Sequence, residues 1–434
     1  MKWRAEHFNG VDWDNRERKN AIYKLINDPG ALLKPFKQPQ RPHVRRTNSI
    51  PQLPSRRLST LLRRFSAGSE TRLEQDDKPA QRPGKGWAED VDMEHGNNDF
   101  LMFSNIDFTH PEVRRELMEW GEWMINIRVQ GFRVDAVQHF SFAYTKDWIQ
   151  HVNQAFHRHS GGSKDVFVVG EVWSGDLSRI TAWLDAVQHS SGHPQVFAFD
   201  APLLYNFSRI SEDLRRRSRN LDLRTILRES LAKNRPKAAV TLVTNHDTQP
   251  GQTCYTPMPR QLKLLWYAFI LLRKHGLPCV FWGDLFGTNG PHAEAAVGVD
   301  NGHDRGGKLL TRSRLAKLIL CRKYFAHGEQ TDYFESPLTI GWTRNGRSGE
   351  DNGGCAMILN VDTSTSKQAT KRMRVGRPGQ IWIDALGQVD SQITIDAAGT
   401  APFPSHGIGV SVFVKQGSKD SLNLAHLHID HCDD

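Results

Sequence analysis

Between Pro111 and Phe325, short runs of consecutive apolar residues alternate with longer segments whose apolar residues recur at helical spacing. The apolar runs predict strands at 131–137, 165–171, 195–200, 238–247 and 278–283. The segments between them predict helices at 111–127, 144–159, 176–189, 221–233, 261–274 and 312–325. Strands without polar alternation, separated by helices, are typical of a parallel β/α architecture, because helices cover both faces of such a sheet.

The pattern changes after about Tyr333. Short strand-like segments, such as LTIGWTR at 338–344 and GIGVSVFVK at 407–415, are separated by Gly, Asn, Asp and Pro. This predicts an antiparallel β-sandwich domain at 333–415. The tail at 416–434 is polar, and its HLHIDHCDD end has metal-binding residue types without a predicted scaffold, so we expect it to be incidental.

Residues 35–82 differ in composition from the rest of the chain, because they are rich in Pro, Ser, Arg and Gln. Six prolines and few apolar residues predict that the segment is disordered. It holds eleven Lys and Arg against four acidic residues, and so carries +7 of the net charge of +9. The basicity therefore belongs to this segment and does not describe the main surface.

The overall composition excludes several classes of protein. With 38% hydrophobic and 24% charged residues, the chain is neither collagen-like nor wholly disordered. No apolar run approaches the about 20 residues that a membrane-spanning helix needs. The start at Met1 has no apolar stretch typical of a secretory signal, and the five cysteines have no CxxC spacing, which predicts reduced thiols. These features favour a cytoplasmic location.

Polar residues lie at the carboxyl ends of three predicted strands: Arg133 and Asp135, then Glu171, then the run from Asn245 to Asp247. The carboxyl ends of barrel strands meet on one face, so we expect these side chains to converge. Asp135 and Glu171 lie 36 residues apart, about one β/α unit. A single carboxylate at a strand end is more often structural, but paired carboxylates with Arg and His companions favour glycosidic bond hydrolysis.

The segments around these residues, GFRVDAVQH, GEVW and VTNHD, resemble the second, third and fourth conserved regions of the α-amylase family, glycoside hydrolase family 13. Further segments, among them KWRAEHFNGVDWD, GKGWAEDVDMEHGNNDFLMF and NHDTQPGQ, resemble its liquefying and intracellular fungal branch. The resemblance covers most of residues 1–30 and 84–415. It implies retaining endo-hydrolysis of α-1,4-glucosidic bonds in starch- or glycogen-like glucans.

The resemblance implies a role for each residue of the three clusters. Asp135 would be the nucleophile that forms a covalent glycosyl-enzyme, and Glu171 the general acid and base with a raised pKa. Asp247 would be the third carboxylate, which holds sugar hydroxyls in the transition state. Arg133 would orient Asp135 and keep it ionised. His246 would bind a hydroxyl of the sugar being cleaved.

The implied set of substrate-binding residues also includes Gln138 and His139. Gln138 stands where the family usually has a lysine that contacts the sugar beyond the cleavage point. Because polarity is retained, we expect altered affinity for that sugar and no loss of chemistry.

A Ca²⁺ site is a second implication of the resemblance. Asp99, Asn105 and Asp107, with the backbone carbonyl of His139, offer the oxygen ligands that calcium prefers. Asn105 stands where an aspartate is common, so a weaker affinity is expected. The alternative is a solvated acidic loop without an ion.

The resemblance accounts for only part of the family's eight-stranded barrel. The five predicted strands correspond to strands four to eight, and the first conserved region has no counterpart upstream of Trp3. We therefore expect an α/β fold, a partial TIM (β/α)8 barrel with strands 4–8 present, followed by the β-sandwich. The expected domain limits are a remnant of the small insertion domain at 1–34, its remainder with the calcium loop at 83–110, and the barrel at 111–332.

An open five-stranded barrel exposes unpaired backbone, so we expect little activity from this chain alone. Two alternatives stay open. In the first, the chain is a catalytically inactive relative that retains glucan binding through its aromatic residues. In the second, segment 35–82 binds nucleic acid or another anionic partner. That segment has only two aromatic residues, Phe36 and Phe65, so it offers few side chains on which bases could stack. The favoured hypothesis is a monomer whose partner is an α-glucan, with no membrane or nucleic acid.

Overall fold

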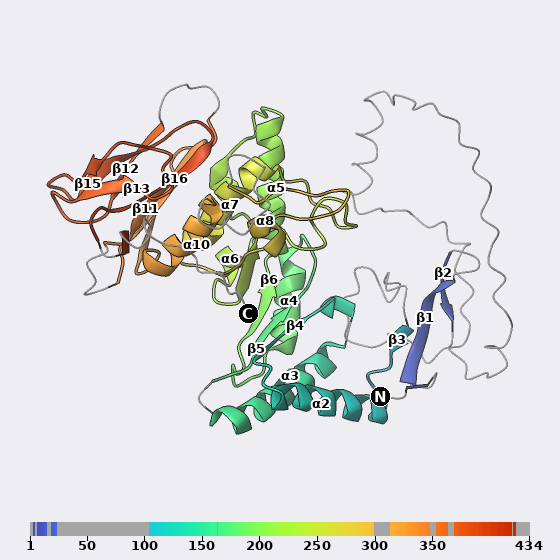
Figure 1. Ribbon diagram of the computed structural model, residues 1–434. Coiled ribbons are helices and arrows are strands. Elements are labelled where there is room, and N and C mark those ends of the chain that lie inside the picture. Colours follow the sequence, from blue (N-terminus) through green and yellow to red (C-terminus); the bar gives the residue numbers. More distant parts are fainter. Residues whose placement is uncertain are drawn as a thin grey trace, which may run out of the picture. The chain divides into compact units, whose positions relative to one another are not determined.

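The computed structural model describes ten stretches of the chain: residues 3–4, 7–14, 19–23, 104–139, 141–162, 164–298, 313–347, 353–362, 369–418 and 420–421. They fall into two compact units, 1–121 and 122–434, and each unit is described by itself (Figure 1). The segment at 35–82, which the sequence predicts to be disordered, lies outside the described residues, as does most of the tail at 416–434.

The first unit contains a three-stranded antiparallel sheet in the order β2-β1-β3. Its strands are β1 (Phe8–Asp14), β2 (Lys19–Tyr23) and β3 (Ser104–Ile106). Pairing of β1 with β3 joins segments that lie about a hundred residues apart in the chain. Beyond β3 the ladder continues, because the backbone N–H of Asp107 donates to the carbonyl of His7 at 2.9 Å. The chain then enters helix α2 (Pro111–Asn126).

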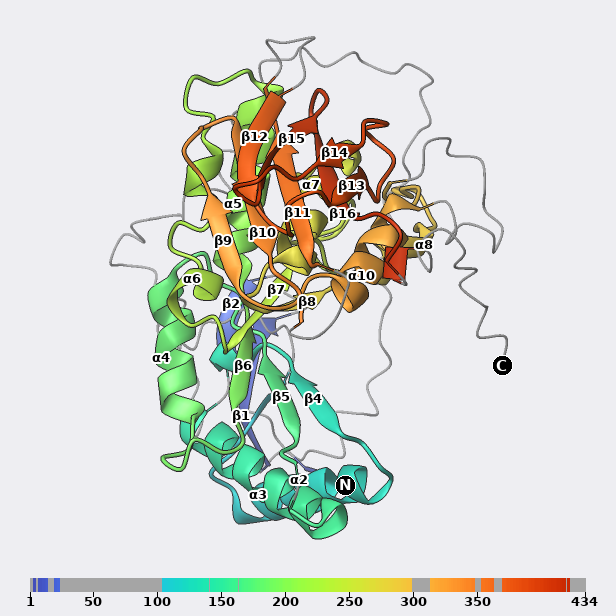
Figure 2. The ribbon, with the colours of Figure 1, turned by 90° about the vertical axis from the view of Figure 1, so that its left-hand side faces the viewer.

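The second unit has a five-stranded parallel sheet in which each strand pairs with the next one along the chain (Figure 2). Its strands are β4 (Gly131–Val134), β5 (Phe167–Gly170), β6 (Val196–Phe199), β7 (Ala239–Leu242) and β8 (Leu277–Cys279). Sequential parallel strands joined by helices are the arrangement of a (β/α) barrel. The predicted partial barrel is therefore confirmed. Within the described residues the sheet is open, with β4 and β8 at its edges.

Helices follow the strands at most of the predicted positions. They are α3 (Phe142–Ser160), α4 (Leu177–Val187), α5 (Ala201–Arg215), α6 (Leu231–Asn234), α7 (Arg260–Leu272), α8 (Trp282–Phe286) and α10 (Arg314–Tyr324), with 3₁₀ turns η3 (Val137–His139) and η4 (Leu223–Thr225). Within the described part of the chain, none of the helices combines the length and the hydropathy needed to cross a membrane.

The predicted helix at 221–233 is wrong, because the long helix after β6 is α5 and the later residues form only η4 and α6. One buried carboxylate explains the difference. Asp200 accepts hydrogen bonds from the backbone N–H groups of Leu203, Leu231 and Ala232 at 3.1, 3.0 and 2.7 Å. It therefore caps α5 and fixes the start of α6 at the same time. Burial raises the pKa of Asp200 to about 6, although these N–H groups oppose the shift.

Helix α7 is buried on nearly all sides and lies between the parallel sheet and the C-terminal strands (Figure 1). Its last carbonyls need donors, because no further helical turn follows. Trp342 Nε1 and Arg344 Nη1 both donate to the carbonyl of Leu272, at 3.3 and 3.4 Å. Arg273 donates two hydrogen bonds to the carboxylate of Asp332, at 2.8 and 2.7 Å. These contacts fasten the C-terminal strands to the partial barrel.

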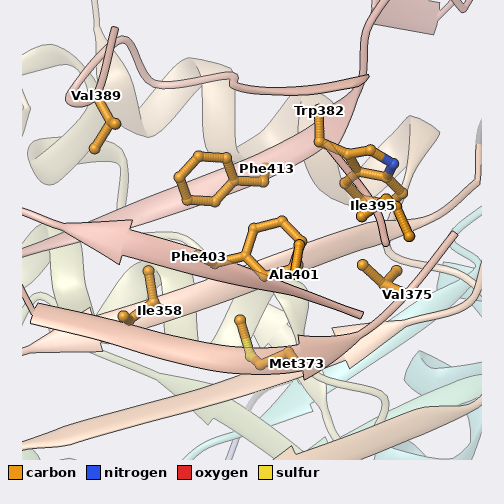
Figure 3. Packing of buried hydrophobic residues seen from close by; sticks show 10 residues of the cluster. Ile358, Met373, Val375, Trp382, Val389, Ile395, Ala401, Phe403 and Phe413 are labelled. Atoms are coloured by element: carbon orange, nitrogen blue, oxygen red, sulfur yellow. The ribbon is translucent and has the colours of Figure 1, made fainter. Parts of the chain in front are cut away.

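The C-terminal strands form two antiparallel sheets, in the orders β14-β13-β16-β11-β10-β9 and β12-β15. The strands are β9 (Gln330–Tyr333), β10 (Thr339–Arg344), β11 (Cys355–Asn360), β12 (Ala369–Arg374), β13 (Ile381–Asp384), β14 (Ile393–Thr394), β15 (Thr400–Ser405) and β16 (Gly409–Lys415). Ile358, Met373, Trp382, Phe403 and Phe413, drawn from both sheets, share one buried cluster (Figure 3). This core between two sheets confirms the predicted β-sandwich.

Replacing Gly170 with alanine is expected to destabilise the second unit by about 1–3 kcal/mol, because the added methyl group overfills the contact between β5 and α4. A Cβ at this position would lie 2.2 Å from Cη2 of the buried Trp183 ring. The midpoint of urea unfolding measures the change.

Gly175→Ala, in the connection between β5 and α4, is the control. Its Cβ would meet Tyr205 at an ordinary 3.4 Å, so it should change stability by no more than about 1 kcal/mol. Equal unfolding midpoints for the two variants would contradict the packing argument.

Candidate active site

Asp135 and Glu171 directly follow two neighbouring strands that end in register. Val134 pairs with Gly170 as the last residue pair of β4 and β5. The ladder then continues, because Glu171 N–H donates to the Val134 carbonyl at 2.9 Å and Val137 N–H donates to the Glu171 carbonyl at 3.2 Å. The backbones that carry the two carboxylates are therefore held side by side at the carboxyl edge of the sheet.

The guanidinium of Arg133 joins the two carboxylates. Its Nη1 donates to Asp135 Oδ1 at 2.5 Å, and its Nη2 lies 2.8 Å from Glu171 Oε1. The Asp135 side chain is 68% exposed, whereas that of Glu171 is 10% exposed. One planar cation therefore orients a carboxylate that faces solvent and a second one that is withdrawn from it.

These surroundings move the pKa values of the two carboxyl groups in opposite directions. Burial raises the pKa of Glu171, and the positive charge of Arg133 offsets this only in part. For Asp135, partial burial opposes ionisation, but hydrogen bonds with Glu171 and Arg133 outweigh it and lower the pKa. An acid with a raised pKa beside a carboxylate with a lowered pKa is the arrangement that combined acid and nucleophilic catalysis requires.

The backbone supplies a further contact to Glu171. The N–H of Ala136 donates to Glu171 Oε2 at 3.3 Å. Ala136 has a φ of 46°, in the left-handed region that residues with a Cβ seldom adopt. Backbone strain of this kind is frequent at functional sites. Sequence reasoning missed Ala136, because an alanine has no reactive side chain and no motif predicts its backbone angle.

The loop after β7 carries the third cluster. Asn245 Oδ1 accepts from the backbone N–H groups of Asp247 and Thr248 at 3.0 and 2.8 Å, which holds a tight turn. His246 Nε2 lies 3.2 Å from Asp247 Oδ2. The charge of His246 also lowers the pKa of Asp135, by less than burial and the hydrogen bonds already described change it. The loop therefore lies within electrostatic reach of the nucleophile candidate.

Cys254 lies further along the same loop. Partial burial raises the pKa of its thiol, and the negative charges of Asp247 and Glu171 raise it further. The thiol is therefore within electrostatic reach of both carboxylates. Sequence reasoning treated this cysteine as incidental, since its spacing to other residues has no catalytic or metal-binding pattern.

Gln138 and His139 lie in the turn η3, directly after Ala136. Gln138 Oε1 is buried, and no donor within the described stretches of the chain bonds to it. A buried acceptor without a donor costs free energy until a ligand or water supplies one. The backbone N–H of His139 donates to the Ala136 carbonyl at 3.1 Å, which closes the turn.

The predicted calcium ligands are described only in part. Asp99 lies outside the described residues, and Asn105 lies in β3. Asp107 is buried, and its Oδ1 accepts from the N–H and the hydroxyl of Thr109 at 2.9 and 2.6 Å. His139 belongs to the second unit. The carboxylate of Asp107 is thus held in place and fits as an oxygen ligand for Ca²⁺.

A cavity of about 390 Å³ lies elsewhere in the second unit. It is lined by Thr241 of β7, Phe269 and Arg273 at helix α7, and Phe334 after β9, among others. None of the residues of the three polar clusters lines it. The candidate active site is therefore formed by the carboxyl ends of the strands and is separate from this cavity.

The chain matches the family model described as the alpha amylase catalytic domain over residues 82–317. It is 33% identical to the glucan 1,4-alpha-maltohexaosidase of Bacillus sp. (strain 707) over 420 residues, 96% of this chain and 64% of that protein. It is 35% identical to the cytoplasmic alpha-amylase of Escherichia coli (strain K12) over 334 residues, 76% of this chain and 62% of that protein. The chain spans only 60 to 65% of the length of four such bacterial relatives.

A similar architecture occurs in the crystal structure of an Anoxybacillus alpha-amylase. It superimposes with a TM-score of 0.52 at 16% sequence identity, over 74% of this chain and 66% of that chain. At this identity the match shows a shared fold and nothing about substrate.

Replacing Arg133 with methionine is expected to raise the pKa of both carboxyl groups. Asp135 loses a hydrogen bond and a neighbouring positive charge, and Glu171 loses the charge that partly offsets its burial. NMR titration of ¹³C-labelled carboxyl groups measures both values. Arg158→Met, which removes a guanidinium paired with Glu122, should leave both values unchanged. If the Asp135 pKa stays equally low in R133M, Arg133 does not control it.

Proposed function

Since the chain belongs to the alpha-amylase family, we propose that it hydrolyses α-1,4-glucosidic bonds of starch- or glycogen-like glucans with retention of anomeric configuration. The observation that carries this proposal is the carboxyl pair around Arg133, with a lowered pKa at Asp135 and a raised one at Glu171. Both carboxyl groups contact the same guanidinium, at 2.5 and 2.8 Å, and this close spacing supports retention. Inverting enzymes keep their carboxyl groups about 6.5–9.5 Å apart to admit a water molecule.

In the first step, the ionised Asp135 attacks the anomeric carbon of the sugar being cleaved. The bond from that carbon to the glycosidic oxygen breaks, and the oxygen keeps the electron pair and takes the proton of Glu171. The departing glucan therefore leaves as a neutral alcohol. A covalent glycosyl ester on Asp135 and an ionised Glu171 remain, which is the double-displacement route of retaining enzymes.

In the second step, Glu171 acts as a base. It takes a proton from a water molecule, whose oxygen attacks the anomeric carbon and displaces the carboxylate of Asp135. Two inversions at one carbon give net retention, and the proton on Glu171 restores the starting state. The raised pKa of Glu171 suits both roles, because it makes the group a competent acid and a competent base near neutral pH.

Asp247 and His246 bind hydroxyl groups of the sugar being cleaved and stabilise its distorted, oxocarbenium-like form. Their mutual 3.2 Å contact and their exposed side chains, 46% and 59%, support this role. Gln138 contacts the sugar beyond the cleavage point, and its place in η3, directly after the Ala136 turn, supports that contact. His139 contributes from the same turn.

The proposal extends to Ca²⁺, with Asp99, Asn105, Asp107 and the carbonyl of His139 as ligands. The bound ion supplies no reacting group and holds loops together. The fixed, buried carboxylate of Asp107 supports this site. No step of the reaction depends on the ion.

Several finer assignments share this status as proposals. The chain belongs to the liquefying and intracellular fungal branch, supported by KWRAEHFNGVDWD at 2–14 and similar segments. A cytoplasmic location is supported by the relative that is named cytoplasmic. We also propose a monomeric state and the domain limits expected from the sequence.

Glucan binding without turnover is a second candidate, and one observation favours it. The Asp135 side chain is 68% exposed, and β4 is an edge strand within the described part of the sheet. An exposed nucleophile is less well preorganised than one enclosed by protein. Calorimetric binding of maltoheptaose without release of reducing ends would select this candidate.

Substituting the two carboxyl groups tests the hydrolytic proposal. Glu171→Gln is expected to lower kcat on soluble starch by about 10²–10⁴-fold, because the leaving oxygen receives no proton. On an activated aryl maltoside its first step should lose far less, because a good leaving group needs no proton. Asp135→Asn should abolish turnover of both substrates. Release of reducing ends and of the aryl group measures the two activities.

Asp390→Asn, which changes an exposed carboxylate of the β-sandwich, is the matched control and should leave both activities unchanged. Normal turnover by Asp135→Asn would rule out the assigned nucleophile. If the first step on the aryl maltoside, measured as the initial burst of released aryl group, loses as much rate in Glu171→Gln as starch hydrolysis does, Glu171 is not the acid.

A further inference from the structure

His7, His110 and Glu112 bring three metal-binding side chains together in the first unit. His7 immediately precedes β1, His110 precedes α2, and Glu112 lies in the first turn of that helix. One ligand atom from each of the three lies within 4.8 Å of the other two. We propose that this trio binds a first-row transition metal of the Zn²⁺ class and thereby fastens the start of β1 to the start of α2.

The contacts within the trio support a single shared ion. His7 Nε2 lies 2.9 Å from Glu112 Oε2. The rings of His7 and His110 are 4.7 Å apart between centroids and inclined by 57°. Small shifts of the side chains would bring all three donors to one ion at about 2.0–2.2 Å.

The chemistry of the donors selects the class of metal. Two imidazole nitrogens and one carboxylate oxygen form a donor set that zinc uses widely, whereas calcium takes oxygen ligands only. The Glu112 side chain is 45% exposed, so water can reach the open side of the site and complete a tetrahedron. The trio is therefore distinct in chemistry from the oxygen ligands proposed around Asp107.

The position of His7 supports a built site rather than an accidental surface cluster. Its side chain is 3% exposed, and its second nitrogen, Nδ1, is held by the backbone of Arg4. Nδ1 lies 2.8 Å from Arg4 N and 3.2 Å from Arg4 O. Without a metal, the N–H of Arg4 donates to Nδ1. With a metal on Nε2, the ring proton lies on Nδ1, and donation to Arg4 O replaces that bond. Such a hydrogen bond to a backbone carbonyl is the usual support of a metal-binding histidine.

The charges near Glu112 are compatible with a bound cation. Arg115 Nη2 lies 3.9 Å from the other oxygen, Oε1, and therefore leaves Oε2 to the trio. An ion at this position would bridge residues that are 105 apart in the chain.

The experiment uses the full chain with the tail residues His426, His428, His431 and Cys432 changed to alanine, so that the tail does not compete for metal. Calcium is kept in excess to fill oxygen-ligand sites. Co²⁺ is added first, because its visible absorption reports tetrahedral coordination, and Zn²⁺ then displaces it. We expect one equivalent of Co²⁺ with a tetrahedral spectrum and tighter binding of Zn²⁺.

Two variants of partly exposed residues test the ligands. Glu112→Gln and His110→Ala should each weaken Zn²⁺ binding by at least about 100-fold, because loss of a mere supporting group already costs 10–100-fold. Glu119→Gln, on the exposed face of the same helix, is the matched control and should bind Zn²⁺ unchanged. Unfolding midpoints without metal verify that all variants are folded.

Unchanged Zn²⁺ affinity in Glu112→Gln and His110→Ala would overturn the proposal, as would the absence of a tetrahedral Co²⁺ spectrum. Either result would leave the trio as an ion pair and a ring contact only. Because no readout involves glucan turnover, the outcome is independent of the hydrolytic function proposed above.

Discussion

Burial of helix α7 is the constraint on which the second unit depends. Eleven of its thirteen residues are buried, including Lys263, whose ammonium group lies 2.8 Å from carboxylate oxygens of both Asp284 and Glu294. A buried charge of this kind is tolerated only with such partners, so α7 fixes the segment after β8 as well. At the other end of the helix, Trp342 and Arg344 both donate to the carbonyl of Leu272, which receives no hydrogen bond from a further helical turn. The helix therefore holds the β-sandwich and the parallel sheet in one unit.

The candidate site depends on a smaller constraint, the single guanidinium between two carboxylates. Arg133 lowers the pKa of both carboxyl groups, but the burial of Glu171 outweighs this effect there. The strand register places all three groups, and the strained turn at Ala136 adds a backbone donor to Glu171. The surroundings alone thus shift the pKa values of two chemically similar carboxyl groups in opposite directions.

The sequence predicts the elements whose signal is local. Apolar runs locate the five parallel strands, and the polar residues that end them locate Asp135 and Glu171. Reasoning fails where contacts between distant residues decide the structure: Asp200 caps α5 and also accepts from the first two N–H groups of α6. The meeting of His7 with Glu112 and the positive φ of Ala136 also have no periodic signature. Contacts between remote residues and unusual backbone angles can therefore be identified only from the structure.

Arg133, Asp135 and Glu171 all come from one strand–helix–strand unit, β4–α3–β5. The bridging cation and the two carboxyl groups, whose pKa values are shifted in opposite directions, are therefore inherited together as a block of about forty residues. Recombination at its borders would exchange the surrounding loops without separating these three charged groups. Selection can thus act on the loops and on the charged groups in different segments of the gene. The rest of the chain is then free to change while one short segment keeps the three groups together.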